Sequence, residues 1–210
     1  MFELDTALPA EIVPLSWLLG VWEGSGVVAY QVDGGIREYE FGQRAAFTQD
    51  GTPHMQYSSS TWLFGTPDGA AADDEPAPAP TPLFSEMGYW RLARPLGAAD
   101  AGPGMLPGIG EPVFTTAEEV ETLRTADGAF ELEVSILHPG GVSELYLGRI
   151  KGPRIDLATD AVVRTASAKE YAAATRLYGL VDNHLLWAWD IAALGQDLRT
   201  HASGRLARVE

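Results

Sequence analysis

Residues 18–26 read Leu-Leu-Gly-Val-Trp-Glu-Gly-Ser-Gly, so that Gly20, Trp22, Gly24 and Gly26 form the pattern G-x-W-x-G-x-G. Glycines at alternate positions leave one face of a strand without side chains, which permits a sharp bend or the close approach of another backbone. The single large ring of Trp22 is suited to filling one end of a closed sheet. The stretch therefore predicts the first strand of a barrel, and by itself it indicates structure rather than ligand contact.

The rest of the chain is a series of runs rich in aromatic and β-branched residues, separated by turn signals such as Gln49-Asp50-Gly51 and His138-Pro139-Gly140. One short helix or turn is predicted at 12–19, ahead of the strands. The predicted strands are 22–30, 37–48, 54–64, 83–94, 129–137, 141–150, 154–165, 169–181, 184–193 and 199–209. About ten strands with so little helix indicate an all-β fold, either a closed antiparallel barrel or a sandwich. A ten-stranded barrel is wide enough to enclose a small-molecule cavity.

Length and composition predict one domain spanning residues 1–210. A chain of 210 residues with 46% hydrophobic residues can bury a sizeable single core. Two stretches, at about 68–82 and 96–111, are rich in Pro, Gly and Ala and lack periodicity. They are predicted to be solvated insertions at hairpin ends.

The charge of the chain limits its partners. A formal net charge of -15 disfavours binding to nucleic acid or to an anionic membrane surface. No apolar run approaches the roughly 20 residues that span a bilayer, and residues 1–11 lack the basic start of a secretion signal. We therefore expect a cytoplasmic protein. The absence of cysteine means that any metal must be held by His, carboxylate or Tyr.

The four histidines differ in their positions. His54, His138 and His184 lie at turns or hairpin corners and are predicted to be solvated. His201 lies inside the last predicted strand. Strict alternation leaves it outside, with an inward ligand role as the less favoured alternative, because the other face carries the more apolar set: Thr200, Ala202, Gly204 and Leu206.

Other catalytic patterns are missing from the sequence. It contains no G-x-S-x-G, phosphate loop or H-E-x-x-H. Asp156, Asp160 and Glu170 have no spacing that would pair them, and in so acidic a chain such residues are mostly surface charges. A hydrolase or a kinase is therefore disfavoured.

Five motifs in order carry a resemblance to a known family: Gly20-x-Trp22-x-Gly24-x-Gly26, Ser-Glu-Met-Gly-Tyr-Trp-Arg at 85–91, Leu-His-Pro-Gly-Gly at 137–141, Ala-Lys-Glu at 168–170 and Gly-Gln-x-Leu-x-x-His at 195–201. With them the chain resembles the nitrobindin family of ferric haem-binding β-barrels over nearly its whole length, the two insertions excepted. The resemblance implies a ten-stranded antiparallel up-and-down barrel, similar in shape to fatty-acid-binding proteins. It also implies one ferric haem b per chain near one mouth of the barrel.

The resemblance further implies roles for particular residues. His201 matches the proximal axial ligand, and a single axial His leaves the sixth iron position open. Lys169 matches a position near the haem propionates, where an ammonium would pair with carboxylate, the alternative being a solvated lysine at a strand end. Val32 stands where many relatives have a Thr that touches haem, and Val cannot donate a hydrogen bond. Phe84 stands where some relatives have a distal His, so Phe84 and Met87 are expected to shape an apolar distal pocket.

The activity that the resemblance implies is isomerisation of peroxynitrite to nitrate, with reversible NO binding, by a monomer or homodimer. The alternative from another class is a haem-free, lipocalin-like carrier of a small apolar or fatty-acid-like ligand. His201 favours the first function, whereas Val32 and Phe84 favour the second. A third alternative is a barrel that senses NO or haem for a partner.

Overall fold

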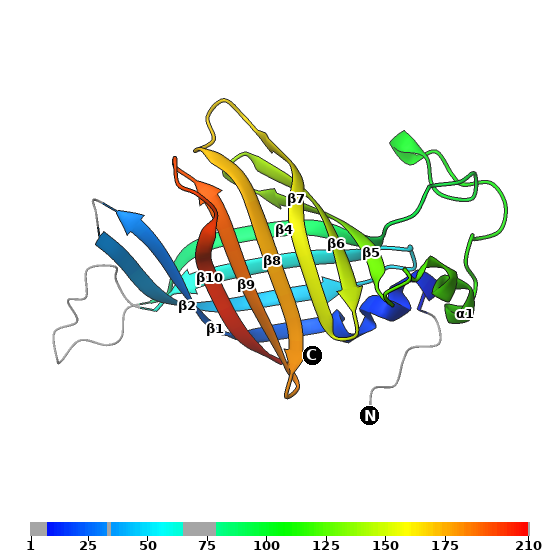
Figure 1. The fold of residues 1–210 in the computed structure, drawn as a ribbon, viewed down its shortest axis with the longest axis horizontal. Helices are drawn as coiled ribbons and strands as arrows, with labels where there is room; N and C mark the ends of the chain where they lie inside the picture. Colours follow the sequence, from blue (N-terminus) through cyan, green and yellow to red (C-terminus); the bar gives the residue numbers. More distant parts are fainter. Residues whose placement is uncertain (1–7, 33–34, 65–78, 210) are drawn as a thin grey trace.

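The computed structural model describes residues 8–32, 35–64 and 79–209. It is a closed antiparallel barrel in which each strand pairs with its neighbours in the chain and β1 pairs with β10 (Figure 1). The prediction of a ten-stranded up-and-down barrel is confirmed, and the sandwich is excluded. The strands are β1 (Gly20–Val32), β2 (Gly35–Thr48), β3 (Met55–Leu63), β4 (Thr81–Leu92), β5 (Phe130–His138), β6 (Val142–Lys151), β7 (Arg154–Arg164), β8 (Tyr171–Val181), β9 (His184–Ala193) and β10 (Arg199–Arg208).

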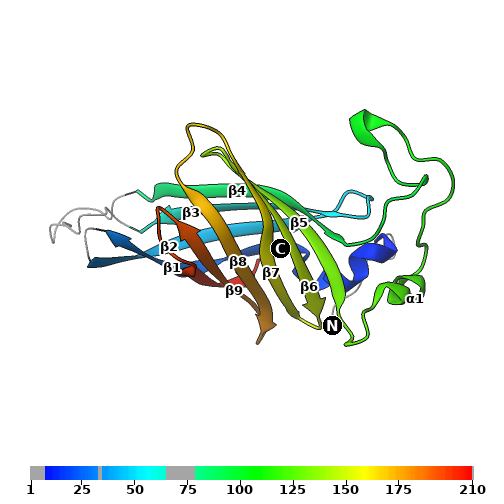
Figure 2. The ribbon, with the colours of Figure 1, turned by 45° about the horizontal axis from the view of Figure 1, so that its top comes forward.

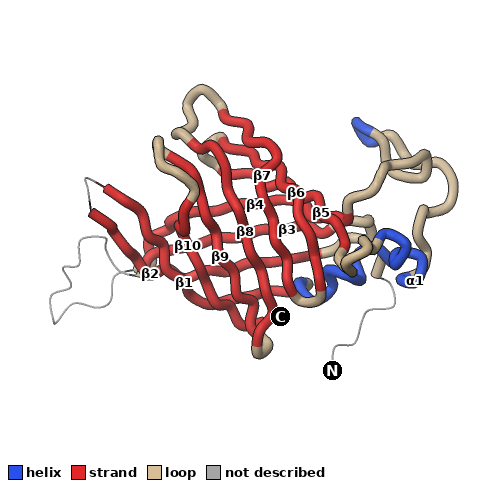
Figure 3. The backbone as a smooth tube through the Cα atoms, in the orientation of Figure 1, coloured by secondary structure: helices blue, strands red, loops and turns tan. Residues whose placement is uncertain are grey.

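Helical segments gather at one end of the barrel, which we call the closed end (Figure 3). The longest is a 3-10 helix where the sequence predicts one. None of the helices in the described ranges is long and apolar enough to cross a membrane. The helical segments are η1 (Ala10–Leu18), η2 (Pro103–Met105), α1 (Ala117–Val120) and η3 (Glu121–Leu123).

The glycines of β1 allow β10 to close the barrel. A Cβ atom on Gly24 would lie 2.2 Å from the carbonyl oxygen of Arg205, and one on Gly26 would lie 2.2 Å from that of Ser203. Any side chain at these two positions would therefore push β10 away. The close backbone approach predicted from the glycine pattern is confirmed.

Trp22 fills the closed end of the barrel, as predicted. Its side chain is fully buried together with Ile12, Leu15 and Leu18 of η1. The indole Nε1 donates a hydrogen bond to the carbonyl oxygen of Leu18 at 2.7 Å, and the Arg208 guanidinium lies 4.3 Å from the ring centre. This end of the barrel is consequently a packed apolar core.

At the opposite end, the open end, neighbouring strands separate. The β1–β10 pairing stops at Val28 and Ala202, and β4 pairs with β5 only from Met87 onward. The β7–β8 pairing covers only Arg154–Ala158 of β7. Turning the molecule shows the strands spreading at this end (Figure 2). Access to the interior is therefore easier here than at the closed end.

The strand ends that flank the two predicted insertions lie at different ends of the barrel. Residues 96–111 contain no strand, are mostly exposed and leave the barrel at the closed end, beyond β4 (Figure 1). The first insertion connects β3 to β4 at the open end. Its residues 68–78 lie outside the described part of the chain, whereas Thr81 and Pro82 already belong to β4.

A buried ion cluster fastens the second insertion to the barrel. The Arg94 side chain, 5% exposed, donates hydrogen bonds to Glu11 of η1 at 2.5 Å and to Asp100 of the insertion at 2.6 Å and 2.8 Å. The hydrogen bonds from Arg94 lower the pKa of Asp100 to about 2. Arg94 thus links the second insertion to η1, although Glu11 and Arg94 are 83 positions apart in the sequence.

We expect Asp100→Asn to lower the free energy of unfolding by about 1–2 kcal/mol at neutral pH, because the Arg94 guanidinium loses an ionised partner. The carboxylate stabilises the fold above its ordinary pKa of 3.8, and this contribution is lost as the pH falls toward 2. Urea titrations of both proteins at several pH values measure the difference. Asp156→Asn, at an exposed ion pair with Arg154, is the control; equal effects of the two variants would contradict the structural role of Asp100.

Candidate functional site

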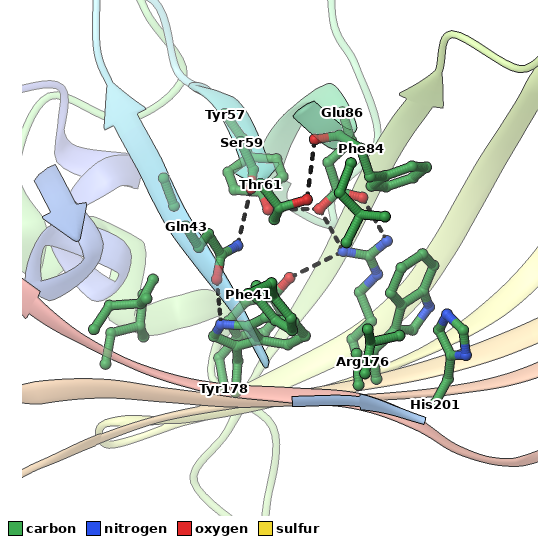
Figure 4. Close-up of a pocket in the computed structure, with 18 of the residues that line it drawn as sticks. Phe41, Gln43, Tyr57, Ser59, Thr61, Phe84, Glu86, Arg176, Tyr178 and His201 are labelled. Atoms are coloured by element: carbon green, nitrogen blue, oxygen red, sulfur yellow. Dashed lines mark hydrogen bonds and ion pairs between the residues drawn. The ribbon is translucent and has the colours of Figure 1, made fainter. Parts of the chain in front are cut away.

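His201 lies at the open end on a β-bulge of β10. Thr200 pairs with Asp190 and Ala202 with Trp189, so His201 between them has no partner on β9. A bulge redirects the side chain of the extra residue. Ala202 faces the core, as strict alternation predicts, yet His201 also lines the cavity (Figure 4). The alternation argument that leaves His201 outside is wrong, because the bulge interrupts the alternation.

The surroundings of His201 favour a neutral imidazole. Burial lowers the pKa of His201, and a hydrogen bond to the backbone of Ala29 opposes this shift only in part. Ala29 lies just beyond the last β1–β10 pair. The backbone of Ala29 thus lies against the imidazole and favours one orientation of the ring. Metal-bound histidines commonly have this arrangement.

The ring of His201 borders two hollows. The inner one, about 330 Å³, lies inside the barrel, and its wall is mainly apolar, with Phe41 and Leu185 among the lining residues. The outer one, about 450 Å³, lies at the rim and includes Lys169. Phe84 and Trp189 line both. The open end thus offers an apolar chamber with the His201 imidazole at its entrance.

The other expected ligand contacts are only partly described. Lys169 is exposed in the β7–β8 connection and lines the outer hollow together with His201. The backbone of Val32 pairs with Gly35 at the end of β1, but the Val32 side chain lies outside the described part of the chain. The structure therefore brings Lys169 to the same hollow as His201 and leaves Val32 unplaced.

Phe84 and Met87 point to opposite sides of β4. The Phe84 ring lies 5.8 Å from that of Trp189 and faces the cavity. Met87 is 58% exposed and lines a groove on the outer surface instead. The expectation that Met87 shapes the pocket is wrong, because alternation along β4 turns Glu86, not Met87, inward.

The prediction that His138 is a solvated turn residue is wrong. Its side chain is only 5% exposed, and its Nε2 lies 2.5 Å from the Glu144 carboxylate. The ring stacks on Trp189 at 6.0 Å, with an interplanar angle of 5°. The turn does follow β5, but the last residue of the strand turns into the barrel mouth. His54 and His184 do lie at hairpin corners, half-buried.

Beside the cavity lies a buried polar cluster that the sequence analysis missed, made of Tyr57, Glu86, His138, Glu144, Tyr146, Tyr171, Arg176 and Tyr178. At its centre the Arg176 guanidinium binds Glu86 through two hydrogen bonds of 2.8 Å (Figure 4). Glu144 lies 3.6 Å from Arg176 and accepts hydrogen bonds from Tyr146 and Tyr171. Two carboxylates and one guanidinium thus share an interior wall.

Ion pairing keeps these groups charged in spite of their burial. Burial acts to raise the pKa of Glu86, but Arg176, together with Tyr57 and His138, lowers the pKa below the ordinary value. The pKa of Glu144 is lowered in the same way, with the hydrogen bond from His138 as the largest favourable cause. Burial acts to lower the pKa of Arg176, and Glu86 raises it well above the ordinary value. All three groups are therefore ionised at neutral pH.

Trp189 connects the polar cluster to His201. The Arg176 guanidinium lies 4.2 Å from the centre of the Trp189 ring, and the His201 ring meets it edge-to-face at 5.5 Å and 84°. Trp189 Nε1 and His138 Nδ1 are buried and lack a hydrogen-bond partner among the described residues, and both side chains line the outer hollow. Trp17 and Trp90 carry the same kind of unpaired Nε1 elsewhere in the described chain, and His138 Nδ1 lies 3.7 Å from the Glu86 carboxylate, so these atoms do not by themselves mark a ligand site.

The site fits a haem in its chemistry. An apolar chamber suits a macrocycle, a neutral imidazole suits iron, and the rim carries a lysine that can meet the propionates. Together with the ten-stranded barrel, these features define a haem-binding class of β-barrel.

Comparison with known proteins agrees with this class. The chain belongs to the family of THAP4-like, heme-binding beta-barrel domains, whose model matches residues 11–208. It is 62% identical to the peroxynitrite isomerase of Leifsonia xyli subsp. xyli and 61% identical to that of Clavibacter michiganensis subsp. michiganensis, over the full length of each chain. The crystal structure of Rv2717c from M. tuberculosis matches with a TM-score of 0.62 and 25% identity, covering 99% of this chain and 100% of the other.

We expect Arg176→Met to lower the free energy of unfolding by about 3–5 kcal/mol, because Glu86 and Glu144 would stay buried without their cation. Chemical denaturation of the haem-free protein measures this change. Arg154→Met removes an arginine of an exposed ion pair and should leave the free energy of unfolding nearly unchanged. A similar small cost for both variants would show that the buried cluster contributes little to the fold.

Proposed function

We propose that this barrel binds one ferric haem b through His201 and isomerises peroxynitrite to nitrate, and that it also binds NO reversibly. The observation that carries the proposal is the bulged His201, neutral and held by Ala29, at the entrance of an apolar chamber. Membership of a heme-binding family supports it, as do close relatives named peroxynitrite isomerase.

The residues around the cavity would have different roles in the proposed reaction. Bound ferric haem supplies a Lewis acid for the peroxynitrite anion. His201 would hold the iron, and the Ala29 backbone beside the imidazole would orient the ring. Phe84 and Trp189 keep water away from the apolar wall. Conversion of peroxynitrite to nitrate transfers no net proton, so this wall needs no acid or base.

The net charge of the protein bears on the class of ligand that it binds. With a formal charge of -15, the chain is suited to small-molecule ligands rather than to nucleic acid or an anionic membrane surface. We propose that it works in the cytoplasm as a monomer or homodimer.

Titration of the haem-free protein with ferric haem tests the role of His201. We expect a Soret shift and a saturable complex with the wild type, and loss of that shift in His201→Ala, because the imidazole ligand is gone. Decay of peroxynitrite and yield of nitrate, followed by stopped flow, should fall to the level of free haem in the same variant.

His184→Ala is the matched control, since His184 lies at a hairpin corner away from both hollows and contacts Asp182 and Arg205. Identical spectra of the wild type and His201→Ala would remove His201 as the ligand. Absence of any spectral change in the wild type would remove haem binding altogether.

The two lysines of the chain provide a second, paired test. We expect Lys169→Met to weaken haem binding by about twofold to fivefold, because an exposed ammonium pairs with a propionate only weakly. The loss should shrink at high salt, since surface ion pairs are screened. Lys151→Met, at the β6–β7 hairpin of the closed end, is the control; equal affinities of the two variants would indicate a merely solvated Lys169.

A further inference from the structure

We propose that Glu86 is an internal carboxylate that occupies a carboxylate-binding site in the wall of the cavity, and that it thereby excludes carboxylate ligands, such as fatty acids, from the barrel interior. This inference goes beyond the proposed function. It concerns the class of ligand that cannot bind in the chamber. It applies to the protein without haem.

The site around the Glu86 carboxylate has the geometry of a receptor for a carboxylate. Arg176 Nη1 donates to Oε1 and Nη2 donates to Oε2, each at 2.8 Å, which is the bidentate arrangement that suits a carboxylate best. The hydroxyl of Tyr57 donates to Oε1 at 2.6 Å. Three hydrogen bonds from two strands thus converge on one anion.

This receptor faces the apolar chamber. Glu86 and Arg176 are 8% and 4% exposed, and both line the inner hollow (Figure 4). Phe41 and Leu185 line the same hollow. A ligand with an apolar tail and a carboxylate head would therefore find both complementary surfaces here if the site were empty.

The remaining donors of Arg176 are also engaged. Its Nε donates to the hydroxyl of Tyr146 at 3.0 Å, and Nη1 lies 3.4 Å from that of Tyr178. Glu144 lies 3.6 Å away on the Nη2 side. A carboxylate that entered the chamber could not pair with Arg176, because the N–H groups of the guanidinium already have partners. It would also be repelled by Glu86 and Glu144, whose two negative charges exceed the single positive charge of Arg176. Repulsion at such a poorly solvated place is strong.

The same charge pattern bears on the orientation of haem. Because the haem propionates cannot bind at Arg176, we expect them to lie at the rim, near Lys169. This consequence rests on the proposed function, whereas the exclusion of carboxylates does not.

The decisive experiment is chemical rescue of Glu86→Ala in the haem-free protein. The substitution removes a CH2–COO⁻ fragment, which is the size of acetate. We expect the variant to melt at a lower temperature than the wild type, since Arg176 loses its bidentate partner. Sodium acetate should then raise the Tm of the variant saturably by several degrees more than sodium chloride at equal ionic strength.

Two proteins serve as controls for the rescue. The wild type should respond to acetate and chloride alike, because Glu86 fills the site. Ser59→Ala should behave like the wild type, because Ser59 lines the same chamber but bonds Gln43 rather than Arg176. A folded Glu86→Ala protein that responds equally to acetate and chloride would overturn the proposal.

A second measurement needs no variant. Displacement of Nile red from the wild-type chamber should show 1-decanol binding at least about tenfold more tightly than decanoate, which has the same chain length and a charged head. In Glu86→Ala, decanoate should gain at least about tenfold in affinity relative to the wild type.

Equal affinities of the wild type for decanol and decanoate would overturn the proposal, even where Glu86→Ala does not fold in either salt. Haem is absent from every arm, so the outcome is independent of the His201→Ala titration that tests the proposed function.

Discussion

The seam between β1 and β10 is the constraint on which both the barrel and its site depend. β10 can reach β1 only because Gly24 and Gly26 present no side chain to the carbonyl groups of Arg205 and Ser203. The pairing then ends at Val28 and Ala202, one residue before the bulge that carries His201. Because the ladder stops there, Ala29 is free to hold the imidazole. One seam therefore closes the sheet and presents the candidate ligand at the place where closure ends.

The two ends of the barrel differ in packing: the closed end is densely packed, and the open end is not. At the closed end Trp22 and η1 form a fully buried core, and the Arg94 cluster fastens the second insertion to it. At the open end strand pairing is incomplete, which costs backbone hydrogen bonds but leaves a chamber. Segments with fewer contacts open more readily, and binding sites are often drawn from them. The dense packing at one end stabilises a fold whose other end must admit a ligand.

Much of this architecture could be predicted from local patterns. Alternation and turn residues were sufficient for all ten strands; Asp182 and Asn183, for example, adopt the positive φ angles of a tight hairpin. His201 could not be oriented in this way, because a bulge depends on the partner strand and leaves no signature in its own strand. The Glu86–Arg176 pair joins residues 90 positions apart. The available signal was Glu86 sharing a face with Phe84 and Trp90, but composition favoured treating acidic residues as surface charges.

The buried polar cluster around Arg176 places charged groups beside an apolar chamber, which requires an explanation. A well-packed apolar wall of similar volume would often be as stable or more so, since removing the three charges of Glu86, Glu144 and Arg176 from water is costly. The cluster provides what apolar side chains cannot. It holds Arg176 against the ring of Trp189, which packs edge-to-face with His201, and so connects a rigid wall to the ring at the chamber entrance. It also gives this wall a charge pattern that disfavours carboxylate ligands. Rigidity at the ligand and discrimination against carboxylates are therefore two results of one arrangement, maintained at a cost that the packing of the closed end can offset.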